Sequence, residues 1–264
     1  WDGWREASDV CKGQAVVPGV IDEIWQWEHV NAALADAERS RIDAMRSAAT
    51  SPCVCGGAWA AAVVHSRLAN RIPIGALCAD ILAALSAGRR ESTPVIVLAG
   101  PCGGEGKSML LKGLNSVFGT SAVFQKPEVG SFPLVALPGK KVVFLDDWRF
   151  SQSVLSYATL CLWYDGSAVS IVRPQNQPGV SGHYLYEGNA PIFATAKAQG
   201  IAALHSEAAI DPLTGYPKDG DASMIIRRLK FYTVRVRVAK PPAALPSCGH
   251  CFATLILEQG RLSA

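Results

Sequence analysis

A glycine-rich stretch in the middle of the chain contains the residues best suited to chemistry. It reads LAGPCGGEGKSMLLKGL over residues 98–114. A phosphate-binding loop has a glycine, four residues and then Gly-Lys-Ser or Gly-Lys-Thr, because glycines let backbone N–H groups converge on phosphate oxygens. Counted back from Gly106, the position of the first glycine holds Pro101, and Gly100 lies one residue further upstream. The pattern predicts a phosphate-binding loop that is one residue longer than usual.

Each residue of this loop has an expected role in binding a nucleotide. The lysine would neutralise charge on the β- and γ-phosphates of ATP, and the hydroxyl of the following serine would bind Mg²⁺. An apolar run precedes the loop and an amphipathic pattern follows it, as a phosphate loop requires. The alternative is an ordinary glycine-rich turn before a helix. The expected cofactor-binding residues are Gly100, Gly103, Gly104, Gly106, Lys107 and Ser108.

A pair of adjacent aspartates strengthens this prediction. The segment VVFLDDW, residues 142–148, is an apolar run that ends in Asp146 and Asp147. Carboxylates at the end of a buried strand are costly unless they face a metal ion or water. Asp146 could hold Mg²⁺ together with Ser108, and Asp147 could polarise an attacking water. Two aspartates can also begin an ordinary loop, but after a phosphate-loop pattern they favour ATP and Mg²⁺ as cofactors.

Apolar runs predict the strands that would position these residues. Residues 94–100, 140–148 and 190–196 are typical of buried strands in a parallel sheet. Residues 227–238, RRLKFYTVRVRV, alternate between polar and apolar positions like an exposed or edge strand. We therefore expect an α/β fold of the P-loop NTPase class, with a central, mostly parallel sheet.

Helical patterns precede this sheet. Residues 29–49, 57–72 and 74–88 have the periodicity of helices, and Gly88 ends the third. The C-terminal part, with KPPAALPSCGHC, is rich in proline. We predict a helical N-terminal or oligomerisation region at 1–90, a P-loop ATPase domain at 91–240 and a peripheral tail at 241–264.

Composition limits the class of protein. Apolar residues make up 49% and charged residues 18% of the chain, so it can bury a core. A net charge of +3 does not identify a nucleic-acid binder, and any basic surface would have to be local. Charged residues or histidine interrupt every apolar run before the roughly 20 residues that a membrane span needs. With no signal peptide and Trp1 as first residue, we expect an intracellular fragment, in the nucleus rather than the cytoplasm, and no membrane partner.

The eight cysteines are scattered along the chain and are typical of reduced intracellular thiols. Four of them could together supply the ligands of a zinc ion: Cys53, Cys55, Cys248 and Cys251. However, Cys-x-Cys is not the common Cys-x2-Cys knuckle, and about 190 residues separate the two halves. Plain thiols are the preferred interpretation.

Several segments, in the same order, resemble superfamily 3 helicases, most closely those of papillomavirus replication proteins. Residues 130–148, GSFPLVALPGKKVVFLDDW, resemble the segment that leads to the family's acidic motif. Residues 164–173, YDGSAVSIVR, resemble the stretch that leads into its DNA-contacting hairpin. Residues 189–197, NAPIFATAK, lie where the family has a sensor strand, and residues 224–231, MIIRRLKF, resemble its arginine-finger segment. The long phosphate loop resembles loops of replication proteins from small circular single-stranded DNA viruses.

This resemblance covers residues 94–238 and implies a modified AAA+ fold. It also implies a hexameric ring that hydrolyses ATP at subunit interfaces and unwinds DNA in the 3′-to-5′ direction. The residues implied to be catalytic are Asp147, Lys197 and one of the pair Arg227 and Arg228, which would act from a neighbouring subunit. Arg227 fits the family's spacing to its aromatic strand residue better.

Two positions depart from the family's pattern. Lys197 stands where the family has Asn, and a lysine is only a hydrogen-bond donor, whereas an asparagine both donates and accepts. The family's hairpin has Lys-His to grip DNA phosphates, whereas this chain reads VRPQNQPGVSGHY and retains Arg173 as the expected DNA contact.

The sequence therefore favours an ATP-dependent DNA helicase domain of a viral or mobile-element replication protein. Its expected partners are single-stranded or forked DNA and further copies of itself. One alternative is a degenerate copy that binds nucleotide without hydrolysing it. Another is a P-loop kinase that acts on a small molecule.

Overall fold

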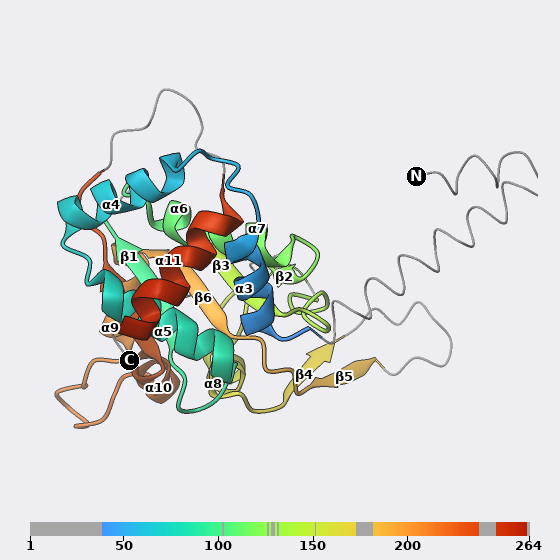
Figure 1. The fold of residues 1–264 in the computed structure, drawn as a ribbon. Helices are drawn as coiled ribbons and strands as arrows, with labels where there is room; N and C mark the ends of the chain where they lie inside the picture. The colour runs from blue at the N-terminus through green and yellow to red at the C-terminus, as the bar shows by residue number, and fades with distance from the viewer. Residues whose placement is uncertain are drawn as a thin grey trace, which may run out of the picture. The chain divides into compact units, whose positions relative to one another are not determined.

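A five-stranded parallel sheet forms the centre of the molecule (Figure 1). The computed structural model describes residues 39–262 except 102, 126, 128, 129, 131, 151, 173–181 and 238–246. In spatial order the strands are β2 (Val123–Phe124), β3 (Val142–Trp148), β6 (Ile192–Lys197), β1 (Val95–Gly100) and β7 (Leu229–Thr233). Every neighbouring pair runs parallel. The predicted α/β class with a mostly parallel sheet is confirmed, and the fold is consistent with a P-loop NTPase-like domain.

The burial of each strand follows from its place in the sheet. Strand β1 is buried along its whole length and β6 up to its last residue, because both have neighbours on two sides and helices over both faces. Such strands need apolar side chains at successive positions, which explains their unbroken apolar sequences. Strand β7 lies at the edge of the sheet and has both buried and exposed positions, so the prediction of an edge strand is confirmed.

The register brings the candidate chemistry to one end of the sheet. Strand β6 lies between β1 and β3 and pairs Lys197 with Gly100, the last residue of β1. On its other side, the pairing with β3 is irregular between Leu145 and Trp148, where the two aspartates lie. Parallel strands end at a common edge. The phosphate loop, the aspartates and Lys197 therefore meet there.

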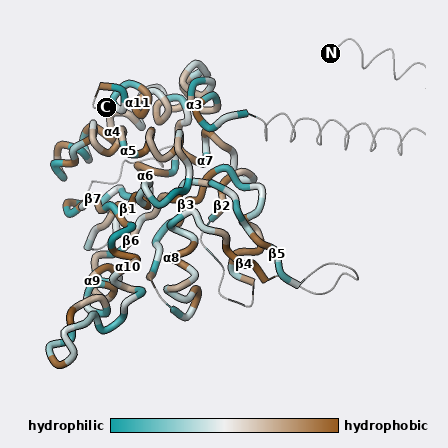
Figure 2. Tube along the Cα trace, turned by 90° about the horizontal axis from the view of Figure 1, so that it is seen from below, coloured by the Kyte–Doolittle hydropathy of each residue, from teal (hydrophilic) through white to brown (hydrophobic). Residues whose placement is uncertain are grey.

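Helices cover both faces of the sheet (Figure 2). Each face of the sheet has its own hydrophobic core. Successive side chains of a strand, such as Ile96 and Val97, belong to different cores because they point to opposite faces. The helices of the first core are α3 (Arg41–Thr50), α4 (Ala58–Asn70), α5 (Ile74–Ala87), α6 (Lys107–Leu111), α7 (Gly113–Phe118) and α11 (Gly249–Leu262). Those of the second are α8 (Tyr157–Asp165), α9 (Ala198–Glu207) and α10 (Gly220–Arg227).

The prediction of a peripheral tail at 241–264 is wrong for its described part. Helix α11 packs against α3, α5 and α7, and it contributes buried side chains to the first core. Phe252 meets Trp59 edge to face, with ring centroids 6.0 Å apart. Its ring also lies so close to Gly113 that a Cβ there would come within 2.3 Å of it. The prolines of this region all precede the helix in the sequence.

The helical region predicted at 1–90 is not separate from the domain that contains the sheet, where the structure describes it. Residues from Arg41 onward belong to one compact unit with the sheet, while residues 1–38 lie outside the described part. Within the described residues, no single helix is long and apolar enough to cross a membrane. Helices α4 and α5 reach the required length and apolar composition only when they are taken together, and the chain bends by 119° between them.

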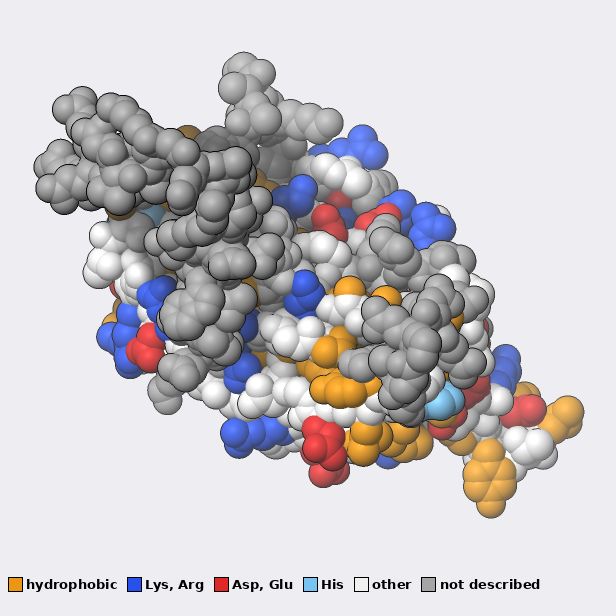
Figure 3. All heavy atoms as spheres, turned by 90° about the vertical axis from the view of Figure 1, so that its right-hand side faces the viewer, with side chains coloured by type: hydrophobic (Ala, Val, Ile, Leu, Met, Phe, Trp, Pro, Cys, Tyr) orange, Lys and Arg blue, Asp and Glu red, His pale blue; other side chains and the backbone are white. Residues whose placement is uncertain are grey.

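A separate antiparallel hairpin projects from the molecule (Figure 1). Its strands are β4 (Val169–Val172) and β5 (His183–Tyr186), and they flank the stretch in which the resemblance implies a DNA-contacting hairpin. Buried Arg89 anchors its base, because its guanidinium donates to the carbonyl oxygens of Trp163 at 2.7 Å and Gly188 at 3.0 Å. Figure 3 shows the molecule from the right-hand side of Figure 1, and on this face hydrophobic and charged side chains lie side by side. Arg173 lies outside the described residues.

Candidate nucleotide-binding site

The predicted phosphate loop connects β1 to α6. Gly104 and Gly106 have φ angles of 87° and 86°, in the left-handed region that glycine adopts without strain. At Gly100 a Cβ would lie 2.4 Å from the carbonyl oxygen of Val234, so no larger residue fits there. Gly103 lies in open space. Gly104 and Gly106 therefore have the backbone role, and Gly100 the steric role, that a tight loop between strand and helix demands.

Lys107, the first residue of α6, pairs with a glutamate that sequence reasoning did not single out. Its Nζ lies 2.6 Å from Oε2 of Glu105, and the two side chains are only 9% and 1% exposed. A buried carboxylate is stable only with a cation or hydrogen-bond donors close by. The ammonium thus lies within the loop beside the positions where phosphates would bind. In the sequence, the only indication of this role for Glu105 was its position inside the loop, two residues before Lys107.

Ser108 and Asp146 meet although 38 residues separate them. The serine Oγ donates to Asp146 Oδ1 at 2.5 Å. Thr195 Oγ1, from β6, donates to the same carboxylate oxygen at 2.7 Å. A hydroxyl and a carboxylate side by side offer the hard oxygen ligands that Mg²⁺ prefers. The arrangement fits the ligand pair predicted for the metal.

Asp147 has an unusual backbone conformation. Its φ angle is 51°, which is costly for a residue other than glycine and requires support from its surroundings. Its N–H donates to Thr195 Oγ1 at 2.8 Å, which supplies that support. The exposed Asp147 carboxylate lies 3.7 Å from Lys197 Nζ, so the structure brings these two predicted catalytic residues together.

Thr195 is thus a positioning residue that sequence reasoning missed. Its buried hydroxyl donates to the Asp146 carboxylate and accepts from the Asp147 N–H. In the sequence, the only indication of this role was a hydroxyl residue near the end of an apolar strand. We expect Thr195→Val to lower the free energy of unfolding by about 1–3 kcal/mol, because it leaves the Asp147 N–H without its acceptor. Urea denaturation measures this change. Thr233→Val, the same substitution at an exposed position of β7, is the control, and equal losses in both variants would contradict the assignment.

The structure separates the roles of Arg227 and Arg228. Arg228 makes two hydrogen bonds to Asp165 at the end of α8, one of them 2.5 Å long from Nη2, and this pairing raises the pKa of the guanidinium. It also donates to the carbonyl oxygen of Met224 at 2.7 Å. Arg228 therefore stabilises the packing of α10 against α8. Arg227, the last residue of α10, is exposed.

Arg227 lies far from the phosphate loop of its own chain. It precedes β7, whose Leu229 pairs with Val95 at the start of β1, whereas the loop follows Gly100 at the other end. At about 3.3 Å per residue, the length of β1 alone separates the two ends by roughly 17 Å. An arginine placed there therefore does not reach the phosphate loop of its own chain.

The fold and the loop define an α/β domain of the P-loop NTPase-like type. No family model matches the chain, and no curated protein matches it. Among solved structures, it is similar to three apo structures of the NrS-1 C-terminal region, with TM-scores of 0.40, 0.42 and 0.35 and sequence identities of 12%, 14% and 11%. The similarity covers 70%, 71% and 70% of this chain and 40%, 41% and 38% of those chains.

Proposed function

We propose that this chain is the ATPase domain of a DNA helicase that acts in replication. The observation that carries the proposal is the meeting of Lys107, the Ser108–Asp146 pair and Asp147 at one end of the sheet. These groups supply a cation for phosphates, oxygen ligands for Mg²⁺ and a carboxylate for an attacking water. Phosphoryl transfer to water depends on positioning and charge stabilisation, which such a set provides.

Oligomerisation and DNA binding belong to the same proposal. Arg227 can act on ATP only from a neighbouring subunit, which supports hydrolysis at subunit interfaces in a ring. The β4–β5 hairpin, at the position where the sequence resembles the helicase hairpin, supports contact with DNA. Repetition of a weakly basic hairpin around a ring would let several subunits follow one phosphate backbone.

Steady-state ATP turnover is the test of this function. We expect turnover per subunit to rise with protein concentration as subunits assemble, and to rise further with single-stranded DNA. The measurement uses Mg²⁺-ATP, a concentration series that spans assembly, and DNA with and without a fork. Turnover that is independent of concentration and DNA would contradict the proposal and favour a monomeric phosphate-loop enzyme.

The pair formed by Lys197 and Asp147 favours a second candidate, a domain that binds ATP without hydrolysing it. The ammonium, 3.7 Å from the carboxylate, attracts the same oxygen atoms that would have to orient an attacking water. Both side chains are nearly half exposed, so water weakens this effect. Tight ATP binding without turnover in the native chain, together with turnover in Lys197→Asn, would establish this candidate.

Glu105→Gln is expected to strengthen ATP binding about tenfold. In the native chain the phosphates must share the Lys107 ammonium with a buried carboxylate 2.6 Å away, and the amide removes that negative charge. Titration with a fluorescent ATP analogue measures the dissociation constant. Glu258→Gln, at an exposed position of α11, is the control for the change in net charge. Weaker binding in Glu105→Gln would show that the carboxylate instead holds Lys107 in its binding position.

A further inference from the structure

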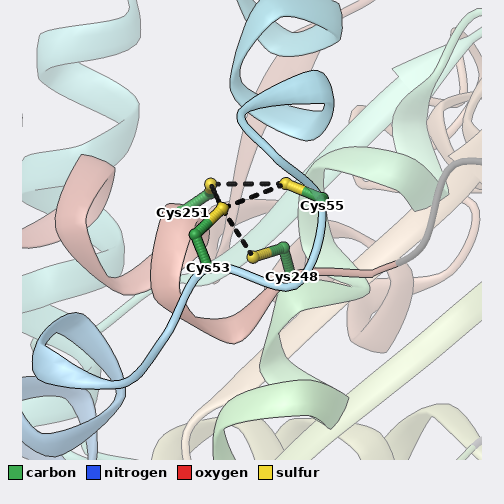
Figure 4. A group of neighbouring side chains, drawn as sticks. All are labelled: Cys53, Cys55, Cys248 and Cys251. Atoms are coloured by element: carbon green, nitrogen blue, oxygen red, sulfur yellow. Dashed lines mark hydrogen bonds between the residues drawn. The ribbon is translucent and has the colours of Figure 1, made fainter.

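Four cysteines from distant parts of the chain meet at one point (Figure 4). Cys53 and Cys55 lie in the loop between α3 and α4, and Cys248 and Cys251 lie at the start of α11. Their four sulfur atoms all lie within 4.8 Å of one another. The two halves are brought together because α11 packs into the first core, contrary to the expectation of a peripheral tail.

The distances between the sulfurs fit a tetrahedral metal site. Cys53 Sγ lies 3.6 Å from Cys55 Sγ, 3.9 Å from Cys248 Sγ and 3.5 Å from Cys251 Sγ, and Cys55 Sγ lies 3.5 Å from Cys251 Sγ. Four thiolates around Zn²⁺, each about 2.3 Å from the ion, would be about 3.8 Å apart. A disulfide requires about 2.05 Å, and all four cysteines are free.

The backbone around Cys53 favours a thiolate at this position. The N–H groups of Gly57 and Cys55 donate to its sulfur, a geometry that stabilises a negatively charged sulfur. Gly56 and Gly57 both have positive φ angles, which turn the chain back toward the sulfur before α4 begins.

We propose that Cys53, Cys55, Cys248 and Cys251 bind one Zn²⁺ in a closed, structural site. Four sulfur ligands select a soft or borderline ion over Mg²⁺ or Ca²⁺. They also complete a tetrahedral shell and leave no open position for water or substrate, so the ion has no catalytic role. His250 lies between two of the ligands in the sequence but is not a member of the cluster.

The position of the site indicates what the ion stabilises. It joins the α3–α4 loop to α11, across about 190 residues of chain. Trp59, four residues after Cys55, packs on Phe252 of α11 and donates from Nε1 to the carbonyl oxygen of Met109 at 3.1 Å. Met109 belongs to α6, the helix that begins with Lys107. Zinc therefore holds together the helices that support the phosphate loop.

Metal content measured by elemental analysis tests the site directly. We expect about one Zn²⁺ per purified chain. The content should fall to near zero in Cys53→Ser and Cys251→Ser. It should remain at one in His250→Gln and in Cys161→Ser, a buried cysteine in the other core. A chelator should lower the melting temperature of the native chain, with recovery on addition of Zn²⁺.

A second measurement decides the question if the serine variants do not fold. The native chain is titrated with a mercurial thiol reagent while a colorimetric chelator records released Zn²⁺, and cobalt substitution is followed by its visible spectrum. One Zn²⁺ released per chain and the intense bands of tetrahedral cobalt thiolate support the site. A native chain that binds no zinc after reconstitution, or that contains iron with thiolate absorption, would overturn it.

Discussion

Replacement of Lys107 by alanine is expected to reduce ATP turnover by a factor on the order of 10²–10³, as expected when a preorganised charge at a transition state is removed. Lys107 is the first residue of α6 and its side chain is only 9% exposed, so its charge lies within the loop rather than in solvent. Alanine removes that charge, and ATP binding should weaken as well. Steady-state turnover and nucleotide titration measure the two effects separately.

The control for this variant must separate catalysis from folding. Lys107→Ala leaves Glu105 as a buried carboxylate without its cation, which by itself destabilises a protein by about 3–5 kcal/mol. The double variant Lys107→Ala/Glu105→Gln removes the uncompensated charge. We expect it to recover stability in urea denaturation but not turnover. Recovery of turnover together with stability would mean that Lys107 has only a structural role.

Arg227→Ala is expected to reduce turnover by about 10³-fold or more while ATP binding stays close to native. An arginine supplied by a neighbouring subunit stabilises charge that develops on the γ-phosphate during transfer, so its loss affects the chemical step. Turnover and nucleotide affinity, measured above the concentration of assembly, test this expectation. Arg228→Ala is the matched control. It should lower the free energy of unfolding by about 1.5–3 kcal/mol through loss of the Asp165 pair.

Mixing of two inactive variants gives a sharper test of action between subunits. In a mixed ring, an Arg227→Ala subunit retains its phosphate loop, and a Lys107→Ala neighbour can present its arginine to that site. We expect the mixture to regain part of the native turnover. A mixture that is as inactive as its components would contradict a role for Arg227 in the neighbouring site, provided that both variants assemble as the native chain does.

Local patterns predicted the sheet and part of the site. Apolar runs identified β1, β3 and β6 because buried parallel strands need apolar side chains at successive positions. The loop glycines and the serine–aspartate pair could be predicted because they belong to two short motifs, one directly after β1 and the other at the end of β3. The same approach failed for α11, because its apolar face is buried only by packing against α3, α5 and α7, which are distant in the sequence.

The sequence by itself determined the phosphate loop, the aspartates that face it and the strands that carry them, because these depend on local conformation and periodicity. The tertiary structure decided which partners they have. The strand order placed Thr195 between both aspartates, and burial paired Glu105 with Lys107. Packing of α11 brought together two cysteine pairs that are about 190 residues apart. Local sequence patterns do not show which distant segments pack together, so the cluster could not be predicted from them.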